Sequence, residues 1–160
     1  MLTRDVVHQR GGGIMDRATE LTQLIVSCWL IAAPGRPIPT SHGVLDRALR
    51  DLWGKEELPE WARGKLHFVD SRVGLQCVEL PVILDRAQKA QLTAAPNPSY
   101  SVAEPRISQA MARRFLKKLN VAESDARRWG TELADAADRA ADELETFELS
   151  HQSSQAAQAS

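Results

Sequence analysis

The most apolar decapeptide of the chain runs from Leu24 to Ala33. It is too short to span a bilayer, which requires about 20 consecutive apolar residues, so it predicts a helix of the protein core. Asp16 or Thr19 is the expected N-cap, and Pro34 ends the helix. Because this helix is apolar on most of its faces, several other elements must pack around it, and this requirement constrains the fold more than any other feature.

Three further helices and a β-hairpin are expected before residue 95. A helix capped by Ser41 carries apolar residues at helical spacing from Val44 to Leu52, with Asp46 among the charged residues of its solvent face. A short helix is expected over residues 56–63, and residues 66–69 and 75–80 form two strands of a hairpin. Pro81 then opens another helix.

Residues 34–40 contain three prolines and predict an extended segment between the first two helices. The resulting order of helices, extended segment and hairpin resembles that of a winged-helix domain. We therefore predict a mainly α protein with a small β-hairpin, in which residues 15–94 form a winged-helix-like N-terminal domain and residues 106–149 a C-terminal helical hairpin. A Pro/Ser linker, 95–105, joins the two, and the polar residues 150–160 predict a disordered tail. Residues 1–14 predict a disordered or non-native extension, and we hypothesise that Met15 is the natural start.

Charge is distributed unevenly along the chain. Residues 94–120 carry five basic residues and one acid, whereas residues 121–160 carry nine acids and three basic residues, although the whole chain has a net charge of only −1. The basic residues lie in a predicted amphipathic helix, 106–119, in which Arg113, Arg114, Lys117 and Lys118 share one arc. This arc predicts a binding site for nucleic-acid phosphates or for an acidic protein surface. The alternative is a solvated helix face whose positive charge is balanced by the acidic last helix.

The longest predicted element is the helix 123–149. Its apolar residues step by 3 or 4 and form a seam for another helix, in this chain or in a partner: Ala126, Trp129, Leu133, Ala136, Ala140, Leu144 and Phe147. Such a helix is about 40 Å long, while the preceding basic helix covers only about 21 Å. We therefore expect a protein partner or self-association, as in a dimer, to cover the remainder.

Catalytic and metal-binding patterns are absent from the sequence. The four histidines are scattered, no zinc spacing, phosphate loop or nucleophile motif occurs, and we predict neither an enzyme nor a cofactor nor a metal site. Cys28 and Cys77 lie in apolar surroundings, and we expect them to be reduced thiols, which favours a cytoplasmic protein. We expect no membrane association, because the apolar run is too short to span a bilayer and a net charge of −1 attracts no membrane surface.

Two functional hypotheses remain. The first is a non-catalytic protein–protein interaction, adaptor or assembly subunit that docks through its C-terminal helices. The alternative is a winged-helix nucleic-acid-binding regulator that uses the basic helix 106–119. Nucleic acid is the second choice, because the predicted winged-helix domain has no net positive charge to attract phosphates.

Overall fold

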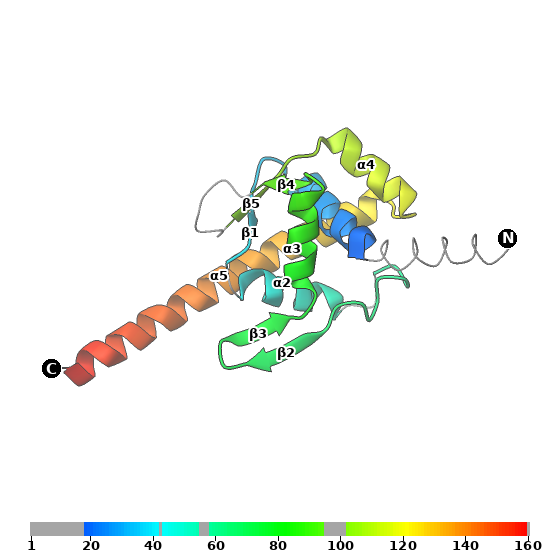
Figure 1. Ribbon diagram of the computed structural model, residues 1–160. Helices are drawn as coiled ribbons and strands as arrows, with labels where there is room; N and C mark the ends of the chain where they lie inside the picture. The colour runs from blue at the N-terminus through cyan, green and yellow to red at the C-terminus, as the bar shows by residue number, and fades with distance from the viewer. Residues whose placement is uncertain (1–17, 42, 55–57, 95–101, 160) are drawn as a thin grey trace.

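The computed structural model describes residues 18–41, 43–54, 58–94 and 102–159. The predicted core helix is confirmed over residues 18–32, and every residue from 21 to 31 is buried. Figure 1 shows this helix, in blue, enclosed by the other elements. The predicted extension 1–14, the proposed start at Met15 and the cap at Asp16 lie outside the described residues.

Helix α2, Val44–Trp53, buries its apolar stripe as predicted, but Asp46 is not on a solvent face. The Asp46 carboxylate accepts hydrogen bonds from the backbone N–H groups of Cys77 at 2.7 Å and Gly43 at 3.1 Å. Asp46 is buried because these two donors replace water, and it thereby joins the start of α2 to strand β3.

The predicted hairpin is confirmed by strands β2, Phe68–Ser71, and β3, Gly74–Cys77, which pair antiparallel. Helix α3, Leu80–Lys89, follows with Pro81 in its first turn, as expected. The short helix expected over 56–63 does not form in its described part. Residues 60–64 are turns, and the N–H groups of Ala62 and Arg63 both bond to the carbonyl of Pro59.

A second small sheet has the antiparallel strand order β1, β5, β4, with β1 at Ile38–Pro39, β4 at Thr93–Ala94 and β5 at Val102–Pro105. The protein is therefore mainly helical with few antiparallel strands, while the winged-helix arrangement is not confirmed. Strand β1 pairs with β5, where Ile38 lies opposite Ala103, 65 residues later, and the β2–β3 hairpin forms a separate sheet. Residues 102–105 of the expected linker thus belong to a sheet, whereas 95–101 lie outside the described residues.

Helices α4, Gln109–Lys118, and α5, Glu123–Ala159, complete the fold. Ser108 caps α4 by accepting a hydrogen bond from the N–H of Met111 at 3.1 Å. The two helices follow each other around a tight corner as expected, but α5 packs chiefly on α2 and on the core helix. At its crossing with the core helix, a Cβ added to Gly130 would lie 2.0 Å from the carbonyl oxygen of Cys28, so only glycine allows this approach.

Helix α5 continues to Ala159, ten residues past the predicted end at Leu149. Residues 150–159, expected to be a disordered tail, are helical. They include alanine and glutamine, which are good helix formers, and they extend a helix that has already been nucleated in the core.

Candidate interaction site

The basic arc of α4 contains one neutralised and three uncompensated cations. Arg113 Nε lies 3.0 Å from Glu123 Oε1 across the α4–α5 corner, and this hydrogen bond is the main cause that holds the pKa of Glu123 below its usual 4.5. Arg114, Lys117 and Lys118 are exposed and form no ion pair with any residue that the structure describes. Arg113 is exposed as well, so all four cations share one exposed face, and one of them is balanced by the acidic last helix.

The acidic stretch of α5 is directed elsewhere. Asp138 forms an ion pair with Arg36, which precedes β1, and Glu143 lies 3.3 Å from Arg47 of α2. Arg139, within the same stretch, lies 3.9 Å from Asp51. These contacts hold the middle of α5 to α2 and β1, and they leave the three cations of α4 without an acidic partner among the described side chains.

Most of the predicted seam is covered by the chain itself. Five of its residues are buried in the core, namely Ala126, Trp129, Leu133, Ala136 and Ala140. Leu144 is partly buried and packs at the start of α2, where a Cβ added to Gly43 would lie 3.5 Å from Leu144 Cδ1. The buried part of the seam therefore ends near Leu144.

Phe147 is the seam residue that these contacts leave outside the core. Its side chain is 67% exposed, and Leu149 beside it is 58% exposed. We call residues 145–159 the projecting segment, because Figure 1 shows this part of α5 running away from the rest of the molecule. Along the described chain, these two side chains are the most exposed large apolar residues other than Val73 of the β2–β3 turn.

One structural cluster was missed by the sequence reasoning. Trp29 Nε1 donates a 2.9 Å hydrogen bond to the carbonyl of Arg36, whose guanidinium lies 5.4 Å from the Trp29 ring centroid and also pairs with Asp138. The cluster closes the turn after the core helix and attaches it to α5. No local signal reveals it, because Arg36 and Asp138 are 102 residues apart.

The part of the chain that the structure describes also bears on metal ligands, thiols and membrane-spanning helices. Among the described residues, no group of three or more His, Cys, Asp or Glu side chains is placed to hold a metal ion. Both cysteines are free and buried, and burial raises the pKa of Cys28 to about 12 and that of Cys77 to about 11. Both thiols are therefore protonated and unreactive at neutral pH. None of the described helices is long and apolar enough to cross a membrane.

Comparison with known proteins gives no relative. No protein-family model, no curated protein and no solved structure matches this chain.

Proposed function

We propose that the protein is a non-catalytic assembly module in which the projecting segment of α5 docks onto helix α4 of a second copy. The observation that carries this proposal is the exposure of Phe147, which continues a seam that is buried elsewhere along α5. Phe147 follows Leu144 by three residues and therefore lies on the same face of the helix. Burial of such a side chain stabilises a contact by roughly 1.5–3 kcal/mol.

Charge supports α4 as the acceptor. Glu145 and Glu148 flank Phe147 on the projecting segment, and both are exposed. On α4, the exposed Met111 shares a face with Arg114 and Lys118 at spacings of 3 and 7 residues. On α5 the apolar Phe147 lies beside acidic side chains, and on α4 the apolar Met111 lies beside cations. The two surfaces are therefore complementary, and every copy of the chain carries both of them.

The test is sedimentation velocity of the full chain across a range of concentrations and salt. Association is expected to increase with protein concentration and to weaken with salt, since the exposed charges are screened. Phe147→Glu is expected to abolish it by placing a charge in the apolar contact. The matched control is Thr146→Glu, which adds the same charge one residue away and about 100° around the helix, and is expected to associate as the native chain does.

Mixing two defective variants tests the pairing of α5 with α4. Phe147→Glu keeps an intact α4, while the triple variant Arg114→Ala/Lys117→Ala/Lys118→Ala keeps an intact projecting segment. Each variant alone is expected to be monomeric, and an equimolar mixture is expected to form a 1:1 dimer. A native chain that is monomeric at every concentration overturns the proposal, and so does a mixture that stays monomeric.

Nucleic-acid binding is the second candidate, and the three uncompensated cations of α4 favour it. Phosphates would be bound by Arg114, Lys117 and Lys118, with an affinity that falls steeply with salt. Fluorescence anisotropy with labelled duplex DNA and single-stranded RNA tests this candidate on the native chain and the triple variant. Arg127→Ala/Arg128→Ala is the control, because these exposed arginines are already close to Glu123 and Asp125. Binding that survives near-physiological salt and is lost only in the triple variant would favour nucleic acid over assembly.

A further inference from the structure

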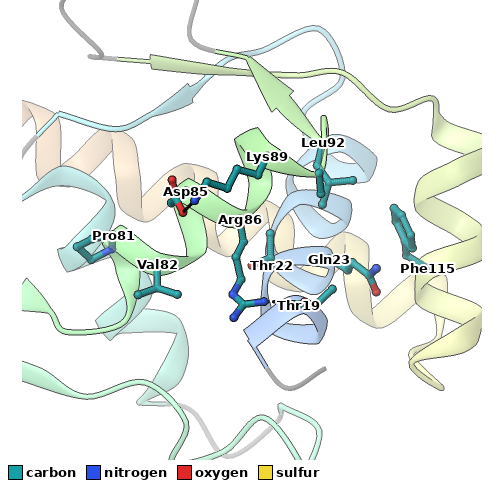
Figure 2. A pocket seen from close by; sticks show the side chains of 11 residues that line it. Thr19, Thr22, Gln23, Pro81, Val82, Asp85, Arg86, Lys89, Leu92 and Phe115 are labelled. Atoms are coloured by element: carbon teal, nitrogen blue, oxygen red, sulfur yellow. Dashed lines mark hydrogen bonds and ion pairs between the residues drawn. The ribbon is translucent and has the colours of Figure 1, made fainter. Parts of the chain in front are cut away.

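A pocket of about 750 Å³ lies between the core helix, α3 and α4, on a different surface from the projecting segment. Its volume is within the range of about 300–1,000 Å³ that is typical of small-molecule sites. Figure 2 shows that α3 contributes one wall, that the core helix contributes the Thr19 to Gln23 turn, and that Phe115 of α4 closes one end. Three segments that are far apart in the sequence thus form one concave surface.

The walls of the pocket are largely apolar. Figure 2 shows Pro81 and Val82 at one end and Leu92 and Phe115 at the other. Val82 is 49% exposed, so the mouth of the pocket is open to solvent at that end. A ligand of this pocket therefore needs an apolar body.

Arg86 is the uncompensated charge in the pocket. Its guanidinium Nη1 is 3.3 Å from the hydroxyl of Thr19, and it forms no ion pair with any carboxylate of the described residues. Lys89, one turn further along α3, is instead neutralised by Asp85 at 2.9 Å. A single free cation beside a neutral ion pair matches a ligand with one negative charge, because Asp85 would repel a second.

Gln23 supplies a second polar contact. Its side chain is about nine-tenths buried, and its carbonyl oxygen accepts no hydrogen bond from any residue that the structure describes. In Figure 2 the carboxamide extends from the core helix toward Phe115, at the opposite side of the pocket from Arg86. A buried side-chain oxygen that accepts no hydrogen bond lowers the stability of the fold. A ligand N–H or O–H group near Phe115 would donate the missing hydrogen bond to Gln23.

We propose that this pocket binds a small organic acid with one carboxylate, an apolar body and a hydrogen-bond donor at the far end. Arg86 binds the carboxylate, the side chains of α3 and Phe115 cover the apolar body, and Gln23 accepts the hydrogen bond. The site is independent of the assembly proposed above, because neither Phe147 nor the three uncompensated cations of α4 line it.

Three related probes separate these contributions in isothermal titration calorimetry with the full chain. Indole-3-acetate has the carboxylate and the N–H donor, indole-3-acetamide lacks the charge, and naphthalene-1-acetate lacks the donor. Indole-3-acetate is expected to bind at least tenfold more tightly than its amide and severalfold more tightly than the naphthalene acid. No detectable binding of indole-3-acetate at millimolar concentration, or equal binding of acid and amide, would overturn the proposal.

Variants locate the site. Arg86→Gln is expected to weaken the binding of indole-3-acetate at least tenfold and to leave the binding of the amide unchanged. Arg72→Gln is the control, because it removes the same charge from the β2–β3 turn, outside the pocket, and it should change the binding of either ligand less than twofold. Gln23→Leu should remove the preference for the indole acid over the naphthalene acid. Circular dichroism of each variant identifies those that fail to fold. An Arg86→Gln protein that is folded and binds indole-3-acetate as the native chain does would place the acid elsewhere and refute the assignment.

Discussion

The two halves of α5 continue one amphipathic helix but have opposite surroundings. Between Ala126 and Ala140 the seam is buried by α2 and the core helix, whereas Phe147, on the same face, is mostly exposed. The difference does not come from hydrophobicity, because phenylalanine is more apolar than the alanines that are buried. It comes from the length of the elements beneath α5, since α2 has only ten residues and its start lies under Leu144. An apolar seam thus predicts that a helix will be covered, and the size of the neighbouring elements decides how much of it the chain covers itself.

The largest expected effect concerns the packed half, at Gly130. In an exposed helix, Gly→Ala stabilises by about 1 kcal/mol, so helix propensity alone predicts a gain. In Gly130→Ala the new Cβ would meet the carbonyl oxygen of Cys28 and the Ala32 Cβ, at 2.0 and 2.7 Å. Because backbone cannot move aside cheaply, we expect a loss of about 3 kcal/mol or more, or a failure to fold, measured by urea denaturation.

Thr131→Ala is the matched control for Gly130→Ala. Thr131 is the exposed neighbour of Gly130 on α5, so its replacement changes helix propensity without entering the crossing. This variant is expected to be at least as stable as the native chain. A Gly130→Ala protein that gains stability in the same way would contradict the close crossing of α5 and the core helix.

Leu133 and Leu149 are leucines from the two halves of α5 and have opposite exposure. Leu133 is fully buried, and Leu149 is 58% exposed. Leu133→Ala should lower the free energy of unfolding by about 2–5 kcal/mol, because it removes buried methyl groups and leaves a cavity. Leu149→Ala should change it by no more than about 0.5 kcal/mol in the monomer. Equal losses at the two positions, measured by denaturation at low protein concentration, would mean that the halves are not packed differently.

The sequence predicted the elements better than their pairing. The core helix was predictable because nine of the ten residues from 24 to 33 are apolar, and the β2–β3 hairpin was predictable because its turn is local. Asp46 was misplaced because helical periodicity assigns it to solvent, while its second hydrogen-bond donor, the N–H of Cys77, lies 31 residues away. The β1–β5 pairing, which involves residues 102 and 103 of the expected linker, depends likewise on residues 65 positions apart, at Ile38↔Ala103.

The candidate sites show the same limit. The sequence indicated the exposed cations of α4, since a run of charges on one helix face needs no tertiary information. Balance by the acidic last helix was an open alternative, but the sequence did not indicate that it would be confined to Arg113, which depends on the corner that brings Glu123 within 3.0 Å. The Arg86 pocket had no sequence signal, because Arg86 and Thr19 are 67 residues apart and Phe115 comes from a third helix.

The smallest expected effect is at that corner, where the packed half of α5 begins. The pKa of Glu123 is lower in the folded chain than its usual 4.5, chiefly through the hydrogen bond from Arg113. A carboxyl group whose pKa is lowered on folding stabilises the protein above its unfolded pKa, and this contribution is lost as the pH falls through the folded pKa. Glu123→Gln should therefore lower the thermal unfolding midpoint slightly at pH 7, and the difference from the native chain should shrink as the pH falls below about 4.5. Glu145→Gln, in the projecting segment, should leave the midpoint of the monomer unchanged throughout, and a Glu123→Gln difference that grows toward low pH would contradict the role of Arg113.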